Sequence, residues 1–110
     1  RYKIKWSIEM EDIAASELVV EAVVEDMIVK QELLTKIESL VSNDCIIATN
    51  TSSLSITGIA SVCSNPSRVL GIHFFNPAPL MPLVEIIPAV QTSEDTLNNL
   101  FLQLFLLYLD

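Results

Sequence analysis

Basic residues are scarce in this chain of 110 residues, in which Lys and Arg number 6, Asp and Glu number 14, and the net charge is -8. A surface this acidic repels phosphate backbones and anionic membrane surfaces, so we expect neither nucleic acid nor membrane as a partner. Cysteine is as scarce, and Cys45 and Cys63 form neither the close pair of a metal knuckle nor a disulfide framework. The thiols favour a reduced intracellular setting, cytoplasmic, or mitochondrial or peroxisomal if the source is eukaryotic.

The chain also has no apolar run long enough to cross a bilayer. The segment "LNNLFLQLFLLYLD" contains ten mostly apolar residues from Leu100, whereas a spanning helix needs about 20. The opening "RYKIKWSIEMED" is charged and amphipathic and does not predict a secretory signal. A helix in the C-terminal segment would be apolar on two faces, so we expect a second copy of the chain or a missing domain to cover it. One face holds Leu97, Leu100, Phe101, Leu104 and Tyr108, and the other holds Leu102, Phe105, Leu106 and Leu109.

Apolar residues, in contrast, make up 51% of the sequence, enough for the core of one small domain spanning 1–110. Alternating or β-branched runs predict strands over 4–10, 16–24, 45–49, 69–75 and 83–88. Helices are predicted after an N-cap at Asp26, over 56–61, and from about Thr92 to the end. The first of these helices has an apolar face formed by Val29, Leu33, Ile37 and Leu40. Strands that alternate with helices through short links predict an α/β fold with a mostly parallel sheet.

Polar side chains come at the carboxyl ends of three predicted strands. They are Glu25 and Asp26, then Asn50, Thr51, Ser52 and Ser53, and then His73 and Asn76. Ligands of open parallel sheets bind in the crevice outside these ends, so separate segments place their polar groups together. Each group also has an ordinary explanation: Asp26, Ser53 or Ser55 as helix caps, Asn76 with Pro77 as a turn, Glu85 as a solvent-facing residue, and His73 as a packed histidine. Their convergence favours a site with His73 as its acid or base.

Three stretches carry a family resemblance: "VVEAVVEDMIVKQELL", "IIATNTSSLSIT" and "GIHFFNPAPLMPLVEII". In this order the chain resembles, from about Ile13 to Ser93, the NAD-binding domain of the 3-hydroxyacyl-CoA dehydrogenases. The resemblance implies a doubly wound, Rossmann-like domain followed by a helical domain that forms a dimer and closes over an acyl-CoA substrate. It also implies the NAD-dependent oxidation of a 3-hydroxyacyl-CoA to the 3-ketoacyl-CoA, as in fatty-acid β-oxidation.

The resemblance further assigns roles to individual residues. His73 matches the catalytic histidine that takes the proton of the 3-hydroxyl group, a task suited to an imidazole. Glu85 matches the carboxylate that orients this imidazole, and Ser52 matches the serine that hydrogen-bonds the 3-oxygen of the substrate. Asn76 matches a residue of the same motif near the reacting carbonyl. The nicotinamide-ribose side of the NAD site corresponds to Glu25, Lys30 and Asn50.

Glycine is scarce too, and this marks where the chain departs from the family. Only Gly58 and Gly71 are present, so no Gly-x-Gly-x-x-Gly turn can approach a pyrophosphate. The acidic residue expected about 20 positions beyond that turn, which distinguishes NAD from NADP, is missing with it. Pro82 replaces a lysine that relatives often carry, and the helical domain with its active-site asparagine is not in the sequence.

These departures lead us to expect a truncated domain without its first βαβ unit, inactive alone. Two alternatives remain open: a non-catalytic interaction module derived from the same domain, and a dehydrogenase of another hydroxy acid.

Overall fold

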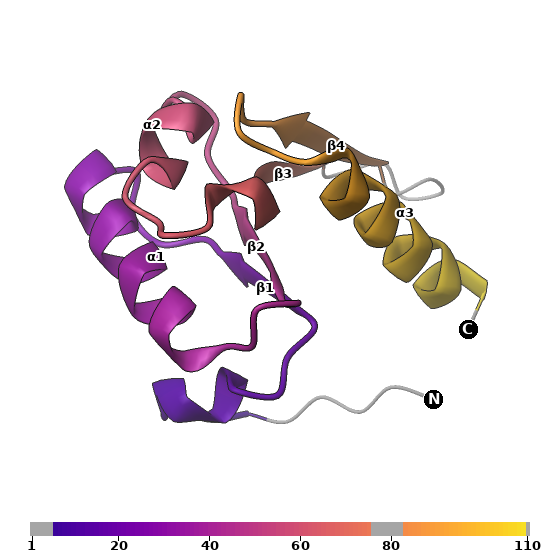
Figure 1. Ribbon diagram of the computed structural model, residues 1–110, viewed down its shortest axis with the longest axis horizontal. Coiled ribbons are helices and arrows are strands. Elements are labelled where there is room, and N and C mark those ends of the chain that lie inside the picture. The colour runs from indigo at the N-terminus through magenta and orange to yellow at the C-terminus, as the bar shows by residue number, and fades with distance from the viewer. Residues whose placement is uncertain (1–5, 76–82, 110) are drawn as a thin grey trace.

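The computed structural model describes residues 6–75 and 83–109, within which four strands form one sheet in the order β1-β2-β3-β4 (Figure 1). The strands are β1 (Leu18–Glu21), β2 (Ile46–Thr49), β3 (Val69–Phe75) and β4 (Leu83–Pro88). β1 pairs with β2 in parallel, and β2 with β3 likewise, whereas β4 returns antiparallel to β3. The predicted α/β class with a mostly parallel sheet is confirmed.

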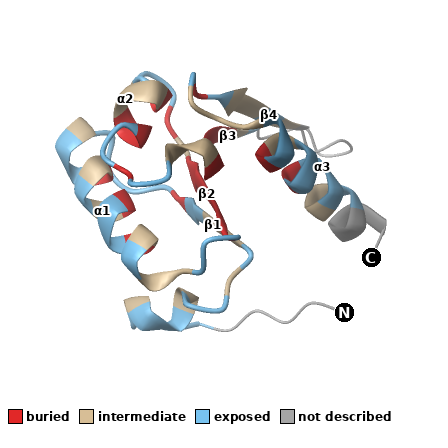
Figure 2. Cartoon of the chain, in the orientation of Figure 1, coloured by how far each residue is buried: buried red, intermediate tan, exposed pale blue. Residues whose placement is uncertain are grey.

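Helices cover both faces of this sheet. α1 (Met27–Leu40) and α2 (Ile56–Ala60) pack on one face, and α3 (Glu94–Leu109) packs on the other (Figure 1). Successive side chains of a strand point to opposite faces, so Ile47 joins the apolar cluster under α1 and α2 while Ile46 and Ala48 join the cluster under α3. Figure 2 shows the buried residues concentrated on β2 and on the sheet-facing sides of the helices.

Helix α1 begins as predicted, because the side chain of Asp26 accepts a hydrogen bond from the backbone N–H of Val29. Its buried face differs from the predicted one by a rotation of about one residue. The structure buries Lys30, Leu34 and Ile37, whereas Val29 is exposed. The prediction placed the face wrongly because it assumed that Lys30 is exposed to solvent. Lys30 is buried because Glu21 is its charged partner inside the protein.

Helix α2 lies directly on β3, and Gly71 is what permits this. A Cβ atom at Gly71 would stand 2.1 Å from Cδ1 and 3.0 Å from Cγ1 of Ile56, the first residue of α2. The side chain of Ser55 caps the helix by accepting from the backbone N–H of Gly58. The 3-10 helix η2 (Pro66–Arg68) then leads into β3.

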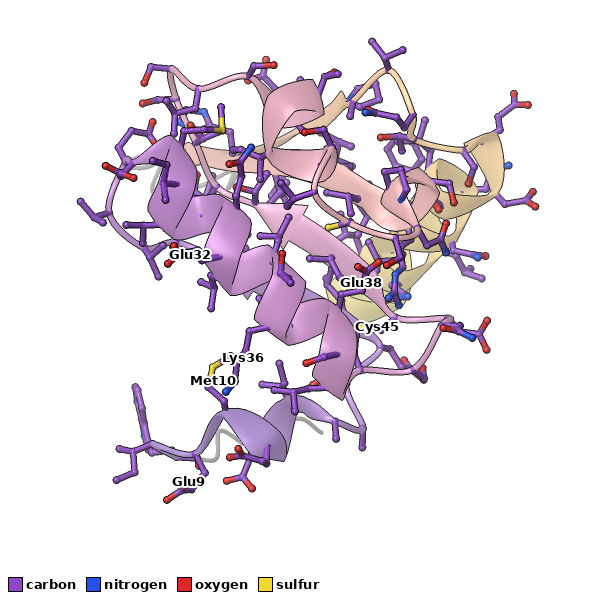
Figure 3. All side chains as sticks on the ribbon, turned by 60° about the vertical axis from the view of Figure 1, so that its left-hand side comes forward. Glu9, Met10, Glu32, Lys36, Glu38 and Cys45 are labelled. Carbon is purple, nitrogen blue, oxygen red and sulfur yellow. The ribbon has the colours of Figure 1, made fainter. Side chains whose placement is uncertain are left out.

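The N-terminal segment differs from its prediction. Within the described residues of 4–10 there is no strand, and the 3-10 helix η1 (Met10–Ile13) follows. Trp6 and Ile8 alternate with polar residues as strand residues would. Both are almost fully exposed, so this segment has no apolar surface of the protein to pack against. η1 lies instead against α1, with Met10 beside Lys36 (Figure 3).

Strand β1 is also shorter than predicted. It ends at Glu21, where the Glu21 carboxylate accepts from the backbone N–H of Val23 and the chain turns away from the sheet. Glu25 and Asp26 therefore lie in the loop between β1 and α1 instead of at the end of the strand.

Helix α3 presents one apolar side to the sheet and one to solvent. Leu100 is buried, and Leu97 and Leu104 pack against the same cluster as Ile46 and Leu70. Phe101, predicted on this inner face, is exposed together with Leu102 and Phe105. In the described part of the chain, α3 and the other helices are too short or too polar to cross a membrane.

Candidate active site

Three strands deliver the candidate residues to one edge of the sheet. β1 and β2 end at Glu21 and Thr49, which are paired in register, and the loops that follow carry Glu25 and Asn50 to Ser53. Thr49 pairs with Gly71, so His73 lies two residues farther along β3, or about 7 Å toward the carboxyl end. This places the imidazole level with the loop after β2, as expected for the crevice of an open parallel sheet.

The carboxylate of Glu25 joins the two loops. One of its oxygens accepts from the hydroxyl of Thr51 at 2.8 Å, and from the backbone N–H groups of Ser52 and Ser53 at 2.9 and 3.2 Å. The hydroxyls of both serines lie 3.2 and 3.1 Å from the same oxygen. These bonds, first the one from the Ser52 backbone and then the one from Thr51, lower the pKa of Glu25 to about 2. Glu25 is therefore an ionised group that ties the loop after β1 to the loop after β2.

Lys30 lies beneath this loop contact, inside the protein. Its ammonium nitrogen is 2.9 Å and 3.1 Å from the two carboxylate oxygens of Glu21, and the side chains of both residues are buried. It also donates to the backbone carbonyls of Val23 and Asn50, at 3.1 and 3.0 Å. The oxygen of Glu25 nearest to Lys30 is 3.8 Å from the ammonium nitrogen. Lys30, predicted to line a cofactor site, thus contacts the protein's own loops.

Glu21 was missed by the sequence analysis, although a signal was present. Within "VVEAVV" it is a single carboxylate in a run that was interpreted as a buried strand. A buried charge must be paired and hydrogen-bonded, so this carboxylate required a cationic partner nearby. The structure supplies Lys30, and the hydroxyl of Thr49 donates a further bond to Glu21.

His73 and Glu85 face each other across β3 and β4. They are register partners in the antiparallel pair, and Nδ1 of His73 is 3.9 Å from Oε1 of Glu85. The histidine side chain is 32% exposed and that of the glutamate 54%, so both reach the surface. The 3.9 Å separation is within the range of an ion pair, while a direct hydrogen bond between these two atoms needs a shorter distance.

Some of the remaining predicted residues lie in the loop after β2, and others cap helices. Ser52 is exposed in the loop after β2, with its hydroxyl on Glu25, and Asn50 is partly buried beside it. Asp26 and Ser55 cap helices, which was their ordinary explanation. Asn76 lies outside the described residues.

Comparison with known proteins identifies the family. Residues 2–104 match the family described as "3-hydroxyacyl-CoA dehydrogenase, NAD binding domain". The chain belongs to this family. The resemblance read from the "HFFNP" region and the expected Rossmann-like fold are thereby confirmed.

Individual relatives give the extent of the match. The chain is 48% identical over 91 residues to a 3-hydroxybutyryl-CoA dehydrogenase of Clostridioides difficile, a match that covers 83% of this chain and 32% of the relative. It is 43% identical over 97 residues to the fatty acid oxidation complex subunit alpha of Psychrobacter cryohalolentis, covering 88% of the chain and 14% of the relative. A 3-hydroxybutyryl-CoA dehydrogenase structure from Escherichia coli K12 superposes with a TM-score of 0.80 at 40% identity, covering 86% of this chain and 20% of that one. The chain thus spans about a third or less of the length of these relatives.

The polar residues at the carboxyl ends of β1 and β2 and the two glycines bear on how a dinucleotide could bind. Glu25 and Ser52 are exposed and Asn50 is partly buried, and groups of these kinds can bind ribose hydroxyls. Gly71 receives α2, and Gly58 lies inside α2, so both glycines are used in packing and neither forms a pyrophosphate-binding turn. The described residues therefore contain no glycine turn of the kind that binds a pyrophosphate.

Proposed function

We propose that this chain is the part of an NAD-dependent 3-hydroxyacyl-CoA dehydrogenase that carries its acid/base residues. The reaction is the oxidation of a 3-hydroxyacyl-CoA to the 3-ketoacyl-CoA, a step of fatty-acid β-oxidation. The observation that carries the proposal is the His73 and Glu85 pair, whose nitrogen and oxygen lie 3.9 Å apart near the carboxyl end of β3. NAD+ supplies the acceptor for the hydride that leaves C3.

His73 is the base in this proposal. Its Nδ1 faces Glu85, so Nε2 takes the proton of the 3-hydroxyl group. Glu85 orients the imidazole ring and stabilises the imidazolium that proton uptake creates. The exposure of both side chains supports this, because a base must reach its substrate.

The loops beside the pair orient the reactants. The hydroxyl of Ser52 hydrogen-bonds the 3-oxygen of the substrate, and Asn76, which lies outside the described residues, is the residue of the family motif near the reacting carbonyl. Glu25 and Asn50 hold the ribose next to the nicotinamide, and the ionised state of Glu25 at neutral pH makes it an acceptor for ribose hydroxyls. Lys30 lies beneath these residues and donates hydrogen bonds to the backbone carbonyls of Val23 and Asn50.

We further propose that the 110 residues alone do not turn over substrate. They carry no glycine turn for the pyrophosphate, and the matches cover only 32% and 14% of the two relatives' own length. The acyl-CoA partner then binds between this domain and a further one, and a second copy or that domain covers the exposed side of α3. Two alternatives compete: a non-catalytic interaction module, and a dehydrogenase of a hydroxy acid that carries no CoA.

A chimeric enzyme tests this proposal. Residues 13–93 would replace the corresponding segment of the Clostridioides difficile relative, which shares 48% identity with the chain over 91 residues. We expect NADH formation from 3-hydroxybutyryl-CoA and little from free 3-hydroxybutyrate. A folded, NAD-binding chimera that is inactive on both would favour the module, and preference for the free acid would favour the other dehydrogenase.

A further inference from the structure

The loop after β2 contains a threonine whose hydroxyl has a hydrogen-bond partner on each side. Thr51 is buried, with 6% of its surface exposed, although Ser52 and Ser53 next to it are exposed. Its hydroxyl donates to the carboxylate of Glu25 at 2.8 Å and accepts from the backbone N–H of Leu54 at 3.1 Å. A hydroxyl has one hydrogen to donate, so these two bonds together fix its direction.

The bond from Leu54 closes a turn of four residues. Thr51 and Leu54 form its ends, and Ser52 and Ser53 lie between them at the surface. Serine and threonine hydroxyls stabilise turns in this way by bonding to nearby backbone groups. The shape of the segment that presents Ser52 thus depends on one side chain.

The bond to Glu25 holds a second loop against this turn. The carboxylate oxygen that accepts from Thr51 also accepts from the backbone N–H groups of Ser52 and Ser53. Among these three donors the hydroxyl of Thr51 is nearest to the oxygen, at 2.8 Å compared with 2.9 and 3.2 Å. Glu25 follows β1 and Thr51 follows the neighbouring strand β2. One hydroxyl therefore contributes both to the shape of one loop and to its distance from the other.

Thr92 shows the same hydroxyl chemistry away from the candidate site. Its hydroxyl donates to the backbone carbonyl of Val69 and accepts from the backbone N–H of Ala89. Both of its partners are backbone groups, whereas the acceptor at Thr51 is an ionised side chain of the candidate site. The comparison separates a hydroxyl that joins parts of the fold from one that bonds to a group of the site.

We propose that Thr51 is a positioning residue: its hydroxyl closes the turn that presents Ser52 and fixes Glu25 against that turn. This inference rests on the proposed dehydrogenase function, in which Ser52 contacts the substrate and Glu25 contacts the ribose of NAD. Thr51 acts on the reaction through these two residues.

The test compares Thr51→Val with Thr51→Ser. Valine keeps the branched shape and replaces the hydroxyl with a methyl group, whereas serine keeps the hydroxyl and lacks the methyl group. The matched control is Thr92→Val, which also removes a hydroxyl that donates one bond and accepts one. We expect Thr51→Val and Thr92→Val to lower the melting temperature to a similar extent, because each removes two hydrogen bonds.

The first readout is the titration of the Glu25 carboxyl group in the full 110-residue chain, followed by its carbon-13 resonance. The backbone bond from Ser52 and then the hydroxyl bond from Thr51 lower the pKa of Glu25 to about 2. The pKa of Glu25 should therefore rise by about one unit in Thr51→Val and stay unchanged in Thr51→Ser and Thr92→Val. Lys30, 3.8 Å from the other oxygen of Glu25, is the same in all three variants.

Two outcomes of this titration would overturn the inference. An unchanged pKa of Glu25 in a folded Thr51→Val chain would show that the hydroxyl does not fix the carboxylate. Loss of the fold in Thr51→Val, with Thr92→Val folded, would show that the hydroxyl holds the domain together and does not act on the two loops alone.

The second readout is kcat and KM in the chimera, which contains both threonines. Misplacing Ser52 should lower kcat about 10-fold in Thr51→Val, and loosening Glu25 should raise KM for NAD+. Thr51→Ser should restore both values to within about twofold of the parent chimera, and Thr92→Val should leave both unchanged. If Thr51→Ser is as slow as Thr51→Val, the packing of the methyl group and not the hydroxyl is what matters, and the inference is wrong. If the unmodified chimera is inactive, the proposed function fails, while the titration still decides whether Thr51 fixes Glu25.

Discussion

His73 and Glu85 face each other because two strands pair antiparallel. In the chimera we predict that His73→Gln lowers kcat by about 10² to 10⁴, the usual contribution of a positioned acid/base, and leaves NAD+ affinity nearly unchanged. Glu85→Gln should give a related loss, because the imidazole loses the carboxylate that lies 3.9 Å from its Nδ1 and orients it.

The double variant His73→Gln/Glu85→Gln and the melting temperatures separate a catalytic pair from a packed histidine. If the two residues act as one unit, the effects on kcat should be markedly non-additive. A His73→Gln protein that is less stable but transfers hydride normally in a single turnover would show a packed histidine instead.

Glu25 gives the second prediction at the scale of a residue. Its pKa in the folded state is about 2, below the ordinary value of 4.5, so its bonds stabilise the fold above pH 4.5 and this contribution is lost as the pH falls toward 2. We therefore expect the parent chain to lose more stability than Glu25→Gln between about pH 5 and pH 3, measured as urea midpoints. Glu32→Gln, at an exposed position of α1, is the matched control, and equal acid sensitivity of Glu25→Gln and the parent would contradict the prediction.

At the scale of elements, the contact between α2 and β3 depends on one missing methyl group. We predict that Gly71→Ala destabilises the chain by about 1–3 kcal/mol, since its Cβ would lie 2.1 Å from Cδ1 of Ile56. Ile56→Val removes that atom and alone should cost about 0.5–1.5 kcal/mol.

Chemical denaturation of the two single variants and the double variant checks this. The double variant should be more stable than the sum of the two losses predicts, because the second change removes the clash made by the first. Additive losses would place the strain at the remaining contacts, which are Cγ1 of Ile56 at 3.0 Å, an atom that valine keeps, and the backbone oxygen of Ile87 at 3.3 Å.

The elements also show where prediction from sequence succeeded. β2 and β3 were predicted within one residue because both are mostly apolar runs that polar residues follow. The strand expected at 4–10 was wrong because alternation predicts a strand only if a neighbouring edge and an apolar surface are available, and Trp6 is 90% exposed.

At the scale of the whole molecule, the exposed side of α3 predicts self-association. Phe101, Leu102 and Phe105 are 56%, 56% and 58% exposed, and they lie near one another on one helix. We expect the chain to associate despite its net charge of -8. Phe101→Gln/Phe105→Gln should shift it toward the monomer by light scattering, while Val90→Gln, at a site that is 88% exposed outside α3, should not. A monomeric parent at high concentration would contradict this.

The sequence by itself determined the class of fold and the family, because both depend on local patterns: apolar runs, helix caps and the "HFFNP" string. Only the tertiary structure decided which charges are paired. Glu21 and Lys30 are nine residues apart in the chain and meet because α1 packs on β1 and β2. Glu25 and Ser52 meet because two loops leave adjacent parallel strands. Burial turns the first of these pairs from a surface ion pair into an internal anchor, and burial depends on what the rest of the chain places around a residue.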